Sequence, residues 1–121
     1  MEYNLKHYAF IGDCVWELFI KELVIKKTPV QNKMHTLSSK YVCAQTQANI
    51  LNKILEKLTK EELEIQKRGR NLKISISKKN NPVVHSLATS FEVLLGYFYL
   101  NDKKRLDEIL DFIKNNLEEL K

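Results

Sequence analysis

Turn-forming residues are scarce in this chain, which has three glycines and two prolines among its 121 residues. A sandwich or barrel of many short strands needs turn residues about every ten positions. The sequence therefore predicts an all-α fold. A length of 121 residues, 44% of them hydrophobic, suits a single domain over 1–121 with one core and no need for disulfides or metal clips.

Apolar residues recur at helical spacing over most of the chain. The spacing predicts a bundle of five or more helices, over 5–26, 39–58, 59–69, 87–98 and 106–120, with 31–36 as a further short helix or a turn. We expect Ser38 and Ser39 to cap the second helix. Thr59 and Glu62 match a capping box at the start of the third helix, and Gly69 is expected near its end.

The segment between Arg70 and Pro82 lacks helical spacing. Ile74 and Ile76 alternate there with serines, as in a short extended piece, and we interpret the segment as a loop. Its charge is unusual, because residues 65–91 have six basic side chains and no acidic one, although the whole chain has a net charge of only +5. The basic residues are Lys67, Arg68, Arg70, Lys73, Lys78 and Lys79. Such a cluster either binds phosphates or forms a solvated surface.

Membrane and metal-binding patterns are weak in the sequence. Apolar runs such as Val93-Leu94-Leu95 are far shorter than the roughly 20 residues that span a bilayer, and no signal peptide is evident at the N-terminus. Cys14 and Cys43 belong to no CxxC or Cys/His cluster, and the three histidines have no ligand spacing. We therefore expect a soluble cytoplasmic protein with no membrane partner.

Two carboxylates lie within otherwise apolar helical stretches, each close to a glycine. Asp13 directly follows Gly12, and Glu92 precedes Gly96 by one helical turn. Glycine inside a helix is about 1 kcal/mol less favourable than alanine, so it usually permits a close approach by another backbone. Two helices packed through these glycines would bring Asp13 and Glu92 together, and a divalent cation would offset both charges. The alternative is that each carboxylate is a rim residue paired with a lysine.

Four segments, in this order, resemble motifs of ribonuclease III domains and specifically of the Mini-ribonuclease III group. The segments are Tyr8 to Glu17, His35 to Val42, Lys67 to Asn71 and Thr89 to Tyr97. The resemblance covers almost the whole chain. It implies the helical bundle of ribonuclease III-type endonucleases, without the separate double-stranded RNA-binding domain that the larger enzymes have.

The same resemblance implies a metal-dependent endoribonuclease that cleaves double-stranded RNA. Of the four carboxylates usual in classical ribonuclease III, this chain has Asp13 and Glu92, while Ala9 and Thr89 occupy the other two positions. Asp13 and Glu92 are then the expected catalytic residues and ligands of Mg²⁺, for which Mn²⁺ could substitute. The resemblance also implies a homodimer in which each subunit cuts one strand and leaves a short 3′ overhang.

RNA binding would fall to the basic segment and to Lys40, because no further RNA-binding domain is expected. The resemblance implies maturation of precursor 23S ribosomal RNA, with a ribosomal protein as a possible assistant. The competing hypothesis is a non-catalytic helical RNA-binding or ribosome-assembly protein of the same fold. A helix-turn-helix DNA-binding protein is disfavoured, since it would place its basic residues on one short recognition helix.

Overall fold

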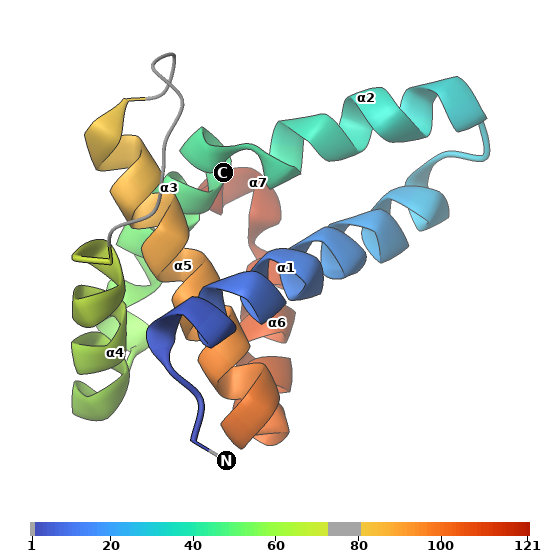
Figure 1. Ribbon diagram of the computed structural model, residues 1–121. Coiled ribbons are helices and arrows are strands. Elements are labelled where there is room, and N and C mark those ends of the chain that lie inside the picture. The colour runs from blue at the N-terminus through green and yellow to red at the C-terminus, as the bar shows by residue number, and fades with distance from the viewer. Residues whose placement is uncertain (1, 73–80) are drawn as a thin grey trace.

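The computed structural model describes residues 2–72 and 81–121, and every regular element within those ranges is a helix (Figure 1). The elements are α1 (Leu5–Lys27), α2 (Gln31–Val42), α3 (Ala44–Ile54), the 3₁₀ turn η1 (Leu55–Lys57), α4 (Lys60–Arg70), α5 (Pro82–Asn101), α6 (Lys103–Asn115) and α7 (Leu117–Leu120). The predicted all-α fold is confirmed.

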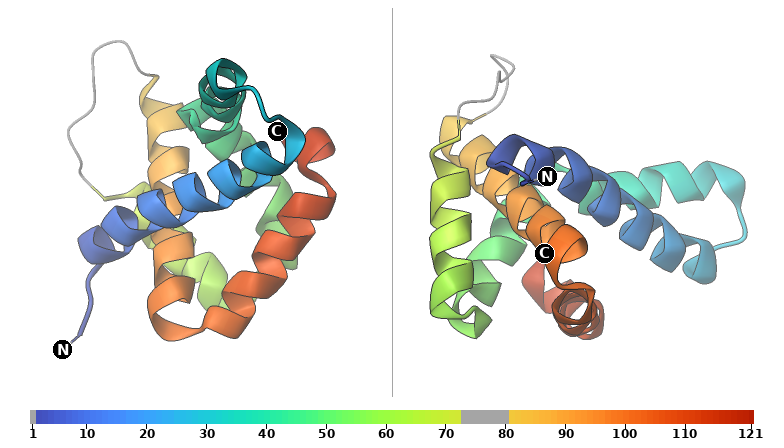
Figure 2. Two further views of the ribbon diagram at one scale, coloured as in Figure 1. Left: turned by 90° about the vertical axis from the view of Figure 1, so that its right-hand side faces the viewer. Right: turned by 60° about the horizontal axis from the view of Figure 1, so that its bottom comes forward.

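Helix α5 is the central element of the bundle. It packs against α1, α3, α4 and α6, and in Figure 2 it crosses behind α1 and beside α4. In the described part of the chain α5 alone is long and apolar enough to span a membrane, and half of its most apolar window is buried inside the fold. Its central position accounts for that apolar composition.

The core forms where α1 crosses α5. Trp16 of α1 packs edge-on against Phe91 of α5, with ring centroids 5.0 Å apart, and both side chains are fully buried. The Trp16 indole Nε1 donates a hydrogen bond to the Tyr41 carbonyl oxygen at 2.9 Å, so the polar group of this large side chain is satisfied. The contact also ties α2 to α1, and the two helices together extend to one side of the bundle (Figure 1).

The predicted helix over 39–58 is wrong, because the chain breaks at Cys43. The Cys43 backbone is extended, with φ −68° and ψ 156°, and α2 ends just before it. Thr46 Oγ1 donates to the Lys40 carbonyl at 2.7 Å and Gln47 Nε2 to the Val42 carbonyl at 3.0 Å. These side chains satisfy carbonyls that the end of α2 leaves unpaired. The helical spacing continues across the corner, so it did not reveal the break.

The expected N-cap at Ser38 and Ser39 is also wrong. Both residues lie inside α2, which begins at Gln31, so residues 31–36 belong to a longer helix than expected. The Ser38 hydroxyl donates back to the Met34 carbonyl at 2.8 Å, and the Ser39 hydroxyl donates to the His35 carbonyl at 2.9 Å. Such back-bonding lets serine remain inside a helix instead of starting one.

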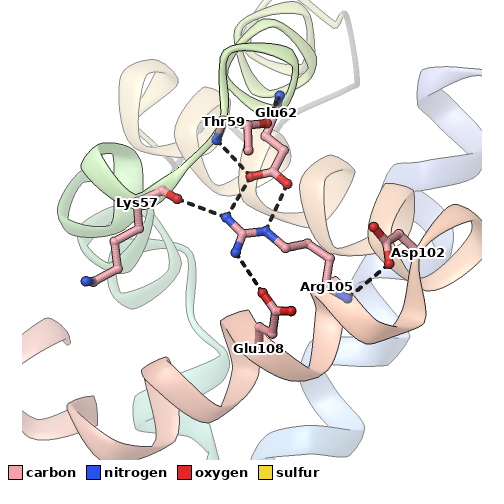
Figure 3. Close-up of polar contacts among 6 residues, drawn as sticks. All are labelled: Lys57, Thr59, Glu62, Asp102, Arg105 and Glu108. Carbon is pink, nitrogen blue, oxygen red and sulfur yellow. Dashed lines mark hydrogen bonds and ion pairs between the residues drawn. The ribbon is translucent and has the colours of Figure 1, made fainter.

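The capping box at the start of α4 is confirmed. Thr59 Oγ1 accepts from the Glu62 backbone N–H, and the Glu62 carboxylate accepts from the Thr59 backbone N–H. Arg105 of α6 donates to both carboxylate oxygens of Glu62 at 2.9 Å and to the Lys57 carbonyl at 2.9 Å (Figure 3). Burial alone would raise the pKa of Glu62, but hydrogen bonds from Arg105 and Thr59 outweigh it and hold this pKa below its usual range.

The loop predicted between Arg70 and Pro82 falls largely on residues 73–80, which lie outside the described ranges. These residues include Lys73, Ile74, Ile76, Lys78 and Lys79. Helix α4 ends at Arg70, one residue after Gly69, and α5 begins five residues earlier than its apolar spacing predicts. The early start follows from capping. The Asn81 side chain accepts from two backbone N–H groups of the first turn, and a proline occupies the first helical position.

Candidate active site

The two carboxylates singled out by the sequence lie where α1 crosses α5. A Cβ atom on Gly12 would overlap the carbonyl group of Glu92, and a Cβ atom on Gly96 would overlap the carbonyl group of Tyr8. The crossing is therefore reciprocal, with each helix placing a glycine against the backbone of the other. The close approach expected from these glycines is confirmed, and no larger residue fits at either position.

The crossing brings the side chains of Asp13 and Glu92 together. Asp13 is exposed and Glu92 is half-buried, and their carboxyl groups share a hydrogen bond. Burial is the largest cause that raises the pKa of Glu92 to about 9, and the hydrogen bond that its protonated carboxyl donates to Asp13 and the negative charge of Asp13 raise it further. Without a cation, the Glu92 carboxyl therefore retains its proton at neutral pH. Glu92 is therefore not a rim carboxylate paired with a lysine, which was the alternative interpretation.

The donor set at this crossing fits a hard divalent cation. Two carboxyl groups supply oxygen ligands, and a cation would offset the like charges that now force Glu92 to stay protonated. Among the described residues, no group of three or more His, Cys, Asp or Glu side chains gathers as a metal cluster. Magnesium tolerates such a sparse site, because it keeps several waters and is commonly completed by substrate phosphates.

The positions of the two missing carboxylates are filled by small side chains that pack into the fold. Ala9 lies one turn before Asp13 on α1, and Thr89 lies three residues before Glu92 on α5. Both are buried, at 7% and 4% exposure, and neither side chain is a carboxylate. The site thus offers Asp13 and Glu92 as its carboxylate donors.

Glu17 and the three histidines lie in different surroundings. Glu17, one turn after Asp13, is exposed and lies 3.6 Å from Lys21. His7 closes the capping box of α1, with its Nδ1 accepting from the Asn4 backbone N–H at 3.0 Å. His35 is exposed on α2, and His85 is half-buried on α5. His85 Nε2 is buried and has no hydrogen-bond partner among the described residues.

The described basic residues of the predicted RNA-binding segment lie in the last turn of α4. Lys67 and Arg68 are exposed, whereas Arg70 is half-buried and its Nε donates to Gln66 Oε1 at 2.9 Å. Lys40 is exposed in the last turn of α2, an element separate from α4. The cluster in the last turn of α4 therefore has at least one side chain held by a buried partner.

Gln66 and Ser90, which no sequence motif singled out, fix this last turn against α5. The Ser90 hydroxyl donates to the Gln66 carbonyl, and the Ser86 hydroxyl donates to the Arg70 carbonyl at 2.6 Å. Gly69 brings α4 close to α5 here, since its missing Cβ would lie 3.1 Å from the Ser90 Cα. The one sequence signal for these contacts was the spacing of Gln66 four residues before Arg70, a spacing that is common in exposed helices.

Comparisons with known proteins assign this sequence to a family. The Ribonuclease III domain family model matches residues 6–103, a range that includes Asp13, Glu92 and the basic last turn of α4. Mini-ribonuclease 3 of Clostridium tetani is 39% identical over 115 residues, covering 92% of this chain and 76% of its own length. Mini-ribonuclease 3 of Synechocystis is 39% identical over 106 residues, covering 88% and 74%.

A solved structure shares the fold. The crystal structure of protein FN1578 from Fusobacterium nucleatum superposes with a TM-score of 0.83 at 25% identity, over 95% of this chain and 94% of that one. The family model, the relatives and the shared bundle agree. The chain belongs to the Mini-ribonuclease 3 family of endoribonucleases, which are built on the ribonuclease III domain.

Proposed function

We propose that this protein is a Mg²⁺-dependent endoribonuclease that cleaves double-stranded RNA, with Asp13 and Glu92 as the residues that hold the cation. The observation that carries the proposal is the glycine-mediated crossing of α1 and α5, which places the two carboxyl groups in hydrogen-bond contact. Keeping the half-buried Glu92 protonated beside Asp13 costs stability at neutral pH, and a bound cation would offset that cost.

The chain's own contribution to the reaction is rigid placement. When bound, Mg²⁺ would lower the pKa of an attacking water and offset charge on the leaving oxygen, while Mn²⁺ could substitute. Asp13 and Glu92 would hold the cation at a crossing where both backbones are in contact, so the backbone positions of the two ligands are fixed relative to each other. The chemistry requires no nucleophile from the protein.

The proposed duplex contact uses the basic ends of two helices. Lys67, Arg68 and Arg70 of α4 and Lys40 of α2 would bind phosphates, together with Lys73, Lys78 and Lys79. A-form RNA is recognised through its shape, phosphates and 2′-hydroxyls, because side chains cannot read its narrow major groove. Affinity should therefore be independent of base sequence and fall steeply with salt.

We further propose that the enzyme works as a homodimer through one side of α1. Phe10, Leu18 and Ile25 are 75%, 62% and 59% exposed, and their spacing places them on the same side of the helix. Exposed apolar residues aligned in this way are typical of a protein interface. Two copies joined there would present one carboxylate pair to each strand of a duplex and leave a short 3′ overhang.

The proposed biological substrate is precursor 23S ribosomal RNA in the bacterial cytoplasm, with a ribosomal protein as an assistant that shapes the stem. The alternative is a non-catalytic RNA-binding or ribosome-assembly protein of the same fold. The carboxylate pair favours the enzyme. A protein without turnover would gain stability by losing one of the two acidic groups, yet both are present at the crossing.

Incubation of the purified protein with a defined RNA duplex tests the proposal. Cleavage of both strands should require Mg²⁺ and stop when a chelator is added, while duplex binding persists. A Glu17→Gln variant, which removes a neighbouring exposed carboxylate, should cleave normally. Binding without cleavage at any Mg²⁺ or Mn²⁺ concentration would establish the non-catalytic alternative. The precursor stem, with and without the ribosomal protein, should then be compared with an unrelated duplex of equal length.

A further inference from the structure

A groove of about 570 Å³ lies between the N-terminal residues and the last turns of α4. One wall includes Tyr3, Lys6 and Tyr8, and the other includes Ile65, Arg68 and Leu72. We call the space between these walls the N-terminal groove. Figure 1 and the right-hand view of Figure 2 both show the first turn of α1 beside the upper part of α4. Its volume is in the range of sites that hold a small organic ligand.

Aromatic rings form the first wall of the groove. The Tyr3 ring is 43% exposed, lies 6.4 Å from the Tyr8 ring at a 57° tilt and meets His7 edge-on. Tyr8 is anchored to α5, since its ring packs edge-on against Tyr97 at 5.5 Å and its hydroxyl accepts from Asn101 at 3.2 Å. The groove therefore has one exposed ring beside one that is firmly held.

The charge of the groove is entirely positive along its described lining. Lys6 and Arg68 contribute cations from opposite walls, and none of the described lining residues is a carboxylate. Both cationic residues are exposed, so their head groups can meet a ligand. Aromatic faces combined with cations suit a ligand that has a flat π-system and a phosphate, which is the chemistry of a nucleotide.

We propose that the N-terminal groove binds one unpaired nucleotide of the RNA substrate, next to the duplex that the enzyme cleaves. The base would stack on Tyr3, and its phosphate would contact Arg68 and Lys6. The nucleotide must be unpaired, because a base inside a duplex has both faces covered by its neighbours. This inference rests on the proposed function, which it extends from duplex cleavage to recognition of the single-stranded flank.

The groove lies close enough to the carboxylate pair to act on the same RNA molecule. Tyr8 precedes Asp13 by five residues on α1, a rise of about 7.5 Å along the helix axis. Arg68 belongs to the basic last turn of α4 that is proposed to bind duplex phosphates. Five residues also turn by about 140° around the helix, so a strand that leaves the duplex near the last turn of α4 would have to pass around α1 to join the groove to the carboxylate pair.

The test compares Tyr3→Leu with Tyr3→Phe on two RNAs in the presence of a chelator, which prevents cleavage. One RNA is a blunt duplex, and the other is the same duplex with a single-stranded extension whose first nucleotide is the fluorescent base 2-aminopurine. Wild type and Tyr3→Phe should bind the extended RNA more tightly and quench the fluorescence by stacking. Tyr3→Leu should lose about tenfold in affinity for the extended RNA alone, and with it the quenching.

The other outcomes separate a failure of this inference from a failure of the proposed function. If the extension adds no affinity in wild type, or Tyr3→Leu weakens both RNAs equally, the inference is wrong while the proposed function stands. If wild type fails to bind the blunt duplex but binds the extension through Tyr3, the groove is supported and the duplex substrate is refuted. Binding of neither RNA refutes both.

Discussion

The Asp13–Glu92 pair should make the metal-free protein less stable as the pH rises, and Glu92→Gln should remove that effect. The pKa of Glu92 is about 9 in the folded protein, against an ordinary value of 4.5. A raised folded-state pKa gives stability that is complete below the unfolded-state value and is lost as pH rises through the folded-state value. Between pH 4.5 and 7, roughly 2.5 pH units, the loss is about 3 kcal/mol.

A glutamine at position 92 has no proton to lose, and its amide can still donate a hydrogen bond to the Asp13 carboxylate. Without metal, Glu92→Gln should therefore match wild type near pH 4 and exceed it at pH 7 by up to about 3 kcal/mol. For a chain of this size, that difference corresponds to a Tm about 10 °C higher. This difference in Tm can be measured by thermal melts followed by circular dichroism, from pH 4 to 9, with chelator present and at one protein concentration.

The same two proteins should also respond differently to Mg²⁺. A ligand that binds only the folded state raises the Tm of a protein. Mg²⁺ should therefore raise the Tm of wild type, and should raise the Tm of Glu92→Gln little or not at all. The Glu17→Gln variant serves as a control, since Glu17 is an exposed carboxylate on the same helix as Asp13. A metal-free Glu92→Gln protein that is less stable than wild type at pH 8, or a difference that does not change with pH, would refute the reasoning.

Three further predictions follow from the packing. Gly12→Ala should abolish folding or lower the Tm by more than about 10 °C in thermal melts, because its Cβ would overlap backbone atoms of α5. Phe10→Glu should convert the proposed dimer to a folded monomer in sedimentation experiments, whereas Val83→Glu, on another helix and similarly exposed, should leave it dimeric. Arg105→Ala should destabilise the fold by about 3 kcal/mol at pH 7, since it leaves the buried Glu62 carboxylate unpaired, and less at pH 4, where that carboxylate takes up a proton. Equal losses at both pH values in urea titrations would show that Arg105 acts through packing alone.

The sequence was sufficient to predict the helical class and the crossing at the centre of the fold. Glycines inside apolar helices have few explanations other than close backbone approach, and that is what Gly12 and Gly96 provide. The corner at Cys43 was not predictable, because apolar residues keep the same helical spacing from α2 into α3. Side chains from beyond the break, at Thr46 and Gln47, stabilise it by hydrogen bonding to the end of α2.

The same division applies to the candidate site. Asp13 and Glu92 could be predicted because an acidic residue in an apolar helix is rare enough to need a reason. The buried contacts of Gln66 with Ser90 and Arg70 join residues that are ordinary in sequence and up to 24 positions apart. The N-terminal groove is of the same kind, since its walls come from segments about 60 residues apart and only the packed fold brings them together.

The most direct test of the central claim is the single-turnover rate at which Asp13→Asn cleaves a bound RNA duplex at saturating Mg²⁺. Asparagine nearly preserves the shape of the side chain but is a poorer ligand for a hard cation. We predict a rate about 10³-fold below wild type, equivalent to roughly 4 kcal/mol of transition-state stabilisation, with folding and duplex affinity unchanged. A rate within a few-fold of wild type would contradict the assignment of the α1–α5 crossing as the metal site.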